Sequence, residues 1–563
     1  MLTGVDATAR RARSLIVPAD TTAICDIAAM TVLAIVAIIA LATFRDYGLG
    51  WDDYTHSQYG ELLLSLFGSG LRDMRAFSFV NLYMYGGGFD MAAALAAKVL
   101  PFDLFETRRL VGAAVGIVGL LATWRLARRL GGPVAGLSAL ILLATCPLYY
   151  GHMFINAKDA PFATAMIVLL LGIARAIDEY PEPAPRTLVL AGVGLGLGFG
   201  SRILAGIAAP GALAALLLIL IVETRAIGLR AAHARLWRFV GLMLPALGLA
   251  YLIMGLLWPW AIQKPLNPIL ASEYFANFFE KPWRELYEGK LYPVPDMPVS
   301  YLPHLFLLTL PEIMLILGVA GFFGALVAAT RRSLAVDRRA ALLLVALAPI
   351  VPVAVAMALH PAFYNGLRHF VFVVPPFAVL GGLAAGWIVQ RARAVFSKDA
   401  LRAYAAPAQA TLAGLFLAGI ALPMSDMVRL HPYQYTAFNW ASGGVRMAHD
   451  NYMLDYWGLA FKQAAEELRA TLAARHIEPP AGRRWIIEIC GPQRPAEIAL
   501  GPQFETTWER HRADFALMLG TYYCRDLRGL PTLVDIRREG VNYARVYDIR
   551  GRPVPQLTTE PPP

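Results

Sequence analysis

Two adjacent carboxylates, Asp52 and Asp53, lie in the motif "WDDYTH" almost directly after about twenty apolar residues. The same motif contains a histidine, His56. Paired carboxylates can supply a general base, and a carboxylate and a histidine together can bind a divalent cation. The motif therefore predicts chemistry at the edge of a membrane. Asp53 and His56 are candidate metal ligands, and whether a divalent metal ion is needed stays open.

Further ionisable residues occur at the ends of later apolar runs, in "GHMFINAKDAP", "GFGSRILAG" and "YNGLRHF": His152, Lys158, Asp159, Arg202, Tyr364, Arg368 and His369. Charged side chains at a membrane edge are costly to desolvate and usually have a partner or a function. Lysine and arginine at helix ends can bind a phosphate. We therefore expect catalytic carboxylates beside a phosphate site formed by Lys158, Arg202 and Arg368, with the histidines and Tyr364 as additional candidates.

The elements that position these residues are predicted to be membrane helices. The 563-residue chain is 57% hydrophobic and only 16% charged, and its mean hydropathy is +0.52. About eleven apolar runs are candidates for crossing a bilayer, which takes about 20 residues. They cover residues 22–44, 110–126, 133–148, 162–176, 187–201, 204–222, 239–258, 302–329, 340–358, 370–390 and 407–424. Arginines are concentrated in alternate loops, which predicts a cytoplasmic N-terminus and places the ionisable clusters together on the outer face.

This topology divides the chain into four regions. Residues 1–21 form a cytoplasmic N-terminus, and 22–424 form the transmembrane domain with a large first external loop at 45–107. Residues 425–550 alternate helical and strand patterns, which predicts a small extracytoplasmic α/β domain. The Pro-rich tail 551–563 is expected to be disordered. Cys490 and Cys524 of the C-terminal domain either pair as a disulfide or remain separate buried thiols.

The order of these motifs resembles a known family. "WDDYTH", "AKDAPF", "GLRHFVFVVPP", "HPYQYTAFNWASGG" and "DYWGLAFKQA" follow one another as in the GT-C membrane glycosyltransferases of family 39, which include protein mannosyltransferases and aminoarabinose transferases. The resemblance implies a GT-C fold and makes Asp52 the catalytic base, with Asp53 in place of the usual glutamate. Which of the two acts is left open by that departure. It also implies that Asp159 lies near the reaction centre, and that Lys158, Arg202 and Arg368 lie near the donor phosphate.

The expected function is transfer of a sugar from a polyprenyl-phosphate donor to an extracytoplasmic acceptor, with inversion at the anomeric carbon. The acceptor is a lipid, a polysaccharide or a protein, and the other partners are membrane lipids. The composition is compatible with a bacterial inner membrane. Nucleic acid is not an expected partner, because the net charge of +10 arises mainly from loops between apolar runs.

Other interpretations of the same residues remain. The acidic pair could cap a helix, Asp159 could mark an ordinary helix start, and Lys158 and Arg368 could extend to lipid headgroups. His152 is typical of a core histidine. A transporter or flippase for a lipid-linked anion, or a non-catalytic envelope assembly protein, are the alternative functions. A transporter is expected to contain inverted repeats and charges near the middle of the bilayer, and the sequence contains neither pattern.

Overall fold

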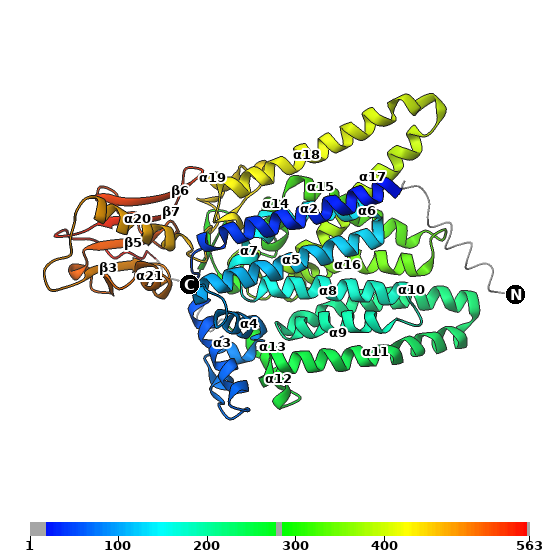
Figure 1. Ribbon diagram of the computed structural model, residues 1–563, viewed down its shortest axis with the longest axis horizontal. Helices are drawn as coiled ribbons and strands as arrows, with labels where there is room; N and C mark the ends of the chain where they lie inside the picture. The colour runs from blue at the N-terminus through cyan, green and yellow to red at the C-terminus, as the bar shows by residue number, and fades with distance from the viewer. Residues whose placement is uncertain (1–18, 277, 279–283, 560–563) are drawn as a thin grey trace.

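The computed structural model describes residues 19–276, 278 and 284–559. Long helices lie side by side in a bundle, and a small domain containing a β-sheet lies at one end of it (Figure 1). The long apolar helices are α2 (Ala19–Thr43), α5 (Leu104–Gly131), α8 (Asp159–Asp178), α10 (Ala209–Ile227), α11 (Leu229–Leu257), α15 (Glu312–Thr330), α16 (Val336–Leu359), α17 (Val374–Phe396) and α18 (Ala405–Arg429). The prediction of a polytopic helical membrane protein with a small C-terminal α/β domain is confirmed.

The number of spans differs from the expected eleven. Within the described ranges, nine helices are long and apolar enough to cross a membrane. The helices α6 (Pro133–Ala144) and α7 (Pro147–Ile155) meet at a bend of 63° and make a tenth span only if the two are counted as one. Residues 187–201, predicted as a span, form α9 (Pro185–Phe199), which at 1.5 Å per residue is only about 22 Å long. The predicted span 302–329 is two helices, α14 (Tyr301–Thr309) and α15, because Pro311 cannot donate a helical hydrogen bond.

The alternating direction of the helices brings the ionisable residues to one end of the bundle. Asp159 begins α8, Arg202 directly precedes the 3-10 helix η5 (Ile203–Ala208), and Arg368 begins the 3-10 helix η7 (Arg368–Val373) that leads into α17. The short helix α9 packs between α8 and α11 and still returns the chain to this end. We call it the site end of the bundle, and the sheet domain lies beyond it (Figure 1).

The expected external loop 45–107 is mostly structured. It contains α3 (Asp53–Gly68), α4 (Gly88–Ala97) and the 3-10 helices η2 (Phe44–Asp46), η3 (Arg75–Ser78) and η4 (Leu82–Met84). Two glycines allow close approaches there. A Cβ atom on Gly48 would lie 2.2 Å from the carbonyl oxygen of Leu459, and one on Gly86 would lie 1.6 Å from that of Gly200. The loop is therefore seated directly against the C-terminal region on one side and the end of α9 on the other.

The segment between α11 and α15 lies near the same end. It contains α12 (Pro259–Gln263), α13 (Asn267–Ala276), the antiparallel hairpin β1 (Arg284–Tyr287) and β2 (Lys290–Pro293), the 3-10 helix η6 (Val294–Asp296), and α14. The hairpin contacts the chain that follows α18, because Tyr287 forms an isolated bridge with Tyr452. This hairpin, together with the C-terminal region, forms part of the cover over the site end.

The C-terminal domain contains a five-stranded sheet in the order β4-β3-β5-β7-β6. Its strands are β3 (Trp485–Cys490), β4 (Phe504–Thr507), β5 (Phe515–Leu519), β6 (Thr532–Arg538) and β7 (Val541–Asp548), and its helices are α20 (Ala460–Ala474) and α21 (Gln493–Leu500). The apolar residues of α20 recur at helical spacing, which gives the helix one buried face. Between α18 and α20 the chain is largely irregular, with the 3-10 helices η9 (Gln434–Thr436) and η10 (Trp440–Ser442) and the short α-helix α19 (Gly444–Ala448).

Two open points about this region are answered by the structure. Cys490 and Cys524 form a disulfide. Residues 551–559 differ from the expected disordered tail, because Leu557 is buried and the amides of Arg525 and Thr559 donate to carbonyls of the tail and the domain. The tail lies against the domain because burial of the apolar Leu557 side chain there is energetically favourable. Residues 560–563, like 1–18, lie outside the described part of the chain.

Candidate active site

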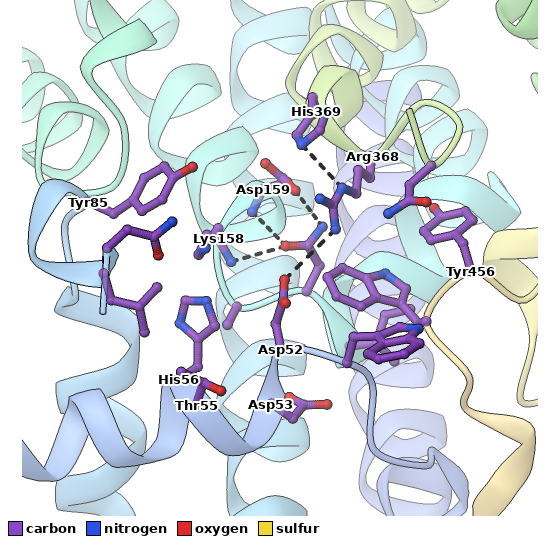
Figure 2. Close-up of a pocket in the computed structure, with 18 of the residues that line it drawn as sticks. Asp52, Asp53, Thr55, His56, Tyr85, Lys158, Asp159, Arg368, His369 and Tyr456 are labelled. Atoms are coloured by element: carbon purple, nitrogen blue, oxygen red, sulfur yellow. Dashed lines mark hydrogen bonds and ion pairs between the residues drawn. The ribbon is translucent and has the colours of Figure 1, made fainter. Parts of the chain in front are cut away.

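A cavity of about 370 Å³ opens at the site end of the bundle and contains most of the predicted site residues. Figure 2 shows these side chains converging from α3, the start of α8 and η7. The lining residues are Trp51, Asp52, Asp53, Thr55, His56, Val80, Asn81, Leu82, Tyr85, Ile155, Asn156, Ala157, Lys158, Asp159, Arg202, Phe278, Tyr364, Asn365, Arg368, His369, Tyr456 and Trp457. Segments that are far apart in the sequence thus supply one polar cavity.

The two carboxylates of the acidic pair have different surroundings. The Asp52 side chain is 46% exposed, and its Oδ2 lies 3.9 Å from a guanidinium nitrogen of Arg368. In Figure 2 it points toward Arg368. The Asp53 side chain is only 4% exposed and its carboxylate is bound by Arg109 on α5, through contacts of 2.5 Å and 3.0 Å. Asp52 is accessible from the cavity, whereas Asp53 is held by a buried arginine.

Asp53 belongs to a buried charge cluster beneath the cavity. Its carboxylate also accepts the Gly50 amide at 2.7 Å. Arg108 pairs with Asp90 at 2.7 Å, and Asp90 in turn binds Nδ1 of His56 at 2.6 Å. Burial alone raises the pKa of the Asp53 carboxyl, but the charge and hydrogen bonds of Arg109 outweigh it and hold that pKa below its ordinary value. Asp53 is therefore ionised and neutralised by its partners.

The two candidate metal ligands, Asp53 and His56, do not fit that role. Both oxygens of the Asp53 carboxylate contact Arg109, and His56 directs one ring nitrogen at Asp90. In the described ranges, no group of three or more His, Cys, Asp or Glu side chains is placed to hold a metal ion. The arginines occupy the lone pairs that a cation would need, so we derive no step that uses a metal at this position.

The second predicted acid, Asp159, forms an ion pair with Arg202. Its other oxygen accepts from the Asn156 side chain at 2.8 Å. The side-chain carbonyl oxygen of Asn156 accepts the backbone amides of Lys158 and Asp159, at 3.1 Å and 2.7 Å, and so holds the turn that leads into α8. Asp159 is 95% buried beside these partners, with its side chain 5% exposed. It positions Arg202 at the cavity and is not an accessible base.

Aromatic rings hold the cations of the cavity. The Lys158 ammonium lies 4.2 Å from the centre of the Tyr85 ring, and the Arg368 guanidinium lies 4.7 Å and 5.0 Å from the centres of the Tyr364 and Trp457 rings. Cations over aromatic faces keep their charge while the site is partly dehydrated. The pKa of Lys158 is lowered to about 8, mainly because the ammonium group is buried. The positive charges of Arg202 and Arg368 lower this pKa as well, whereas the negative charge of Asp52 raises it. No ion pair of Lys158 occurs in the part of the chain that the structure describes.

The charges leave the cavity with a net positive balance. Lys158, Arg202 and Arg368 face the carboxylates of Asp52 and Asp159, while the charge of Asp53 is neutralised by Arg109. Three cations against two carboxylates leave one positive charge. An arrangement of this kind favours an anionic ligand, and a phosphate group matches the two arginines and the lysine.

Several residues lining the cavity are not predicted by the sequence analysis: Tyr85, Asn156, Tyr456 and Trp457. Tyr456 and Trp457 belong to the motif "DYWG". The aspartate of this motif, Asp455, fixes the chain beside them by accepting the amides of Gly458, Leu459 and Ala460, where the chain enters α20. An Asp just before an amphipathic helix is a capping signal that could have revealed this anchor. In "INAKD", the spacing of Asn156 before Asp159 is a similar signal.

The predicted histidines have different positions. His369 lines the cavity and accepts from the Arg368 Nε at 3.2 Å, and Tyr364 contacts its ring. His56 lines the wall beside Asp90. His152 does not reach the cavity: it is fully buried behind the wall and contacts Asn156 at 3.2 Å and the Tyr456 hydroxyl at 3.0 Å. It therefore supports two lining residues from behind.

Comparison with known proteins adds a family match and several distant structural likenesses. No curated protein matches the chain. ArnT from Cupriavidus metallidurans in the apo state is 17% identical with a TM-score of 0.47, and the match covers 94% of this chain and 98% of that chain. The structure of the same protein bound to undecaprenyl phosphate is 16% identical with a TM-score of 0.46, at the same coverage. The oligosaccharyltransferase AglB from Archaeoglobus fulgidus, in complex with an inhibitory peptide and a dolichol-phosphate, is 13% identical with a TM-score of 0.45, covering 87% of this chain and 69% of that one.

The family model matches a part of the chain that contributes directly to the cavity. It covers residues 89–248, from the start of α4 into α11, and includes Lys158, Asp159 and Arg202. The resemblance to glycosyltransferase family 39 is confirmed by this match, because residues 89–248 are similar to the family of dolichyl-phosphate-mannose-protein mannosyltransferases.

Proposed function

We propose that this multi-pass membrane protein is a glycosyltransferase that moves a sugar from a polyprenyl-phosphate donor to an extracytoplasmic acceptor. The match of residues 89–248 to a family named for a dolichyl-phosphate-mannose donor supports the class of donor. The cavity supports the class of reaction, because it combines one accessible carboxylate with three cations at the end of a membrane bundle. The positive-inside pattern of arginines supports an outward-facing site, and a bacterial inner membrane is part of the proposal.

The observation that carries the proposal is the position of Asp52. It is the half-exposed member of the acidic pair, and it faces Arg368 across 3.9 Å, a separation that leaves its carboxylate available. A general base has to reach the proton that it removes. Asp53 and Asp159 are each bound to arginine in buried ion pairs. We therefore assign the role of base to Asp52, and a positioning role to the other two.

The proposed reaction is a single displacement at the anomeric carbon. Asp52 accepts the proton of the acceptor hydroxyl, whose oxygen forms a bond to that carbon from one side. The bond from the carbon to the phosphate oxygen breaks on the opposite side, and the electron pair leaves with the polyprenyl phosphate. One displacement inverts the anomeric configuration, which NMR of the product would test.

The cations act on the charge that develops during this step. The phosphodiester of the donor carries about one negative charge, and the monoester that leaves carries about two at neutral pH. Lys158, Arg202 and Arg368 stabilise the added charge more in the transition state than in the bound donor, which is the condition for acceleration. Asp159 and the rings of Tyr85, Tyr364 and Trp457 fix the cations in place.

The test is turnover of radiolabelled polyprenyl-phosphate sugars by purified protein, with candidate acceptors, comparing wild type with Asp52→Asn. The matched control is Asp296→Asn, an exposed aspartate outside the cavity. We expect the Asp52 variant to elute as a folded particle and to lose at least about a hundredfold in kcat, the usual contribution of a general base. Equal turnover by wild type and Asp52→Asn would overturn the assignment of Asp52 as the base. No turnover by wild type with any donor and acceptor would overturn the proposed function, and a transporter or an assembly role would then explain the site better.

A further inference from the structure

A buried carboxyl group outside the active-site cavity, Glu285, lies on strand β1. The residue is only 2% exposed. Its Oε1 accepts hydrogen bonds from the Asn365 amide at 3.2 Å and from the Tyr301 hydroxyl at 3.4 Å. Its Oε2 is buried as well and has no hydrogen-bond partner among the described residues. Leaving a carboxyl oxygen buried and unpaired is costly. This cost in folding free energy suggests that Glu285 has a role at this position.

The contacts of Glu285 converge on one turn, Asn365–Gly366, between α16 and η7. Both residues are left-handed, with φ of 54° and 64°. Asparagine adopts this conformation more readily than most residues other than glycine, and contacts from outside the turn fix it here. Glu285 binds the Asn365 amide, and the Tyr301 hydroxyl accepts the Gly366 amide at 2.9 Å. The two consecutive amides of the turn are thus fixed by Glu285 and its partner.

The turn lies directly beside residues of the active-site cavity. Tyr364 and Asn365 line the cavity, and Arg368 follows two residues after Gly366. We propose that Glu285 is a positioning residue, which holds the turn Asn365–Gly366 and thereby sets Tyr364 and Arg368 at the donor phosphate. This inference deepens the proposed function and rests on it for the identity of the ligand, but the contacts themselves do not depend on it.

Glu285 also joins the turn to the cover over the site. The same strand carries Tyr287, which bridges Tyr452 and whose hydroxyl contacts His304 at 2.9 Å. A second, smaller cavity of about 30 Å³ lies beside Glu285, and Tyr456 lines both this cavity and the active-site cavity. The hairpin, the turn and the C-terminal segment therefore meet at one carboxyl group. A change at Glu285 is expected to alter how all three fit.

The electrostatics of Glu285 predict a dependence on pH. Burial raises its pKa to about 7, while the Asn365 amide, the Tyr301 hydroxyl and the charge of Arg368 act in the opposite direction. The titratable groups facing it are Tyr301 from α14, Arg368 from η7, and Tyr435, Tyr452 and Tyr456 from the C-terminal segment. When the turn opens, the carboxyl reaches water and its pKa returns to about 4.3.

The sign of the effect follows from this difference. The closed turn binds the proton more tightly than the open turn, so the closed form is favoured most at low pH. The equilibrium constant for closing the turn falls by up to about tenfold for each pH unit between about 5 and 7, and is constant at higher pH. Glutamine cannot ionise, and therefore Glu285→Gln should remove this dependence while keeping an oxygen acceptor for the Asn365 amide.

Hydrogen exchange of the full-length protein in detergent tests the proposal without any substrate. Protection of the amides in residues 363–368, corrected for intrinsic exchange, should fall between pH 5 and 7 in wild type and in the control Glu288→Gln, an exposed residue of the same hairpin. It should be independent of pH in Glu285→Gln. The same fall with pH in wild type and in Glu285→Gln would overturn the proposal.

Turnover supplies the second measurement. Glu285→Ala, if it folds, should lower kcat at least about tenfold because Arg368 is displaced, and Glu285→Gln should restore most of it at pH 6. An unchanged kcat in Glu285→Ala would also overturn the positioning role. If wild type transfers no sugar at all, the proposed function fails, and the exchange experiment still decides whether Glu285 holds the turn.

Discussion

Replacing Asp53 with asparagine should destabilise the fold and spare the chemistry. The Asp53 and Arg109 side chains are 4% and 3% exposed, and their charges are balanced only by the cluster that includes Arg108 and Asp90. Removing one charge leaves a buried guanidinium without its partner, which usually costs about 3–5 kcal/mol. Asparagine keeps one oxygen that can accept from Arg109, so we expect a loss near the lower limit, about 3 kcal/mol.

The assay is thermal unfolding of purified protein in detergent, beside turnover measured well below the melting temperature. Asp53→Asn should melt earlier than wild type and retain most of its kcat. The double variant Asp53→Asn/Arg109→Gln removes both charges, so it should be less destabilised than the sum of the single variants. That non-additivity would show that the loss arises from an uncompensated charge.

The pH dependence gives an independent check. Because the folded-state pKa of Asp53 is lowered, its stabilising contribution is present above the unfolded value of about 3.9 and is lost as pH falls through the folded value. Wild type should therefore lose stability below about pH 4, and Asp53→Asn should lose less over the same range. A variant that melts like wild type but transfers no sugar would refute the reasoning and would make Asp53 the base.

The other predictions concern the remaining contacts of the cavity. In wild type, kcat/KM should fall as pH rises through about 8, where Lys158 of the free protein loses its charge, and Lys158→Arg should remove that fall. Arg202→Gln should lower kcat at least about tenfold, and Asp159→Asn should lower it less, since the arginine remains. Asp455→Ala should cost about 2 kcal/mol in thermal unfolding, because three amides and the Tyr435 hydroxyl lose their acceptor.

The sequence predicts the bundle and the shared face of the site because both depend on local patterns. Apolar runs of about twenty residues mark the long helices, and arginine-rich turns predict their direction. The same approach places Lys158, Asp159, Arg202 and Arg368 near helix ends, where the structure has them. Its errors are local too: α9 is shorter than its apolar run suggests, and a proline divides the predicted span 302–329.

The partners of the site residues could not be predicted in this way. Asp53 binds Arg109, which is 56 positions away, and His56 binds Asp90 across 34 positions. Such pairs depend on how separate segments pack against each other, and this packing cannot be predicted from the spacing of residues within one motif. Asp53 and His56 are candidate metal ligands from the motif alone, but Arg109, which binds the Asp53 carboxylate, and Asp90, which binds His56, both lie outside that motif. The roles of Glu285 and Trp457 likewise depend on contacts with residues far away in the sequence, Asn365 and Arg368.

The different fates of Asp52 and Asp53 follow from helix geometry. Successive residues at the start of a helix point about 100° apart, so adjacent side chains meet different surroundings. Asp52 precedes α3 and faces the cavity, whereas Asp53 begins the helix and turns toward α5. Its short side chain accepts the Gly50 amide at 2.7 Å while contacting Arg109, and a glutamate would have to fit an extra methylene into that buried space. An aspartate at position 53 thus suits a residue that anchors the loop, and under the proposed function Asp52 is the carboxylate available for proton transfer.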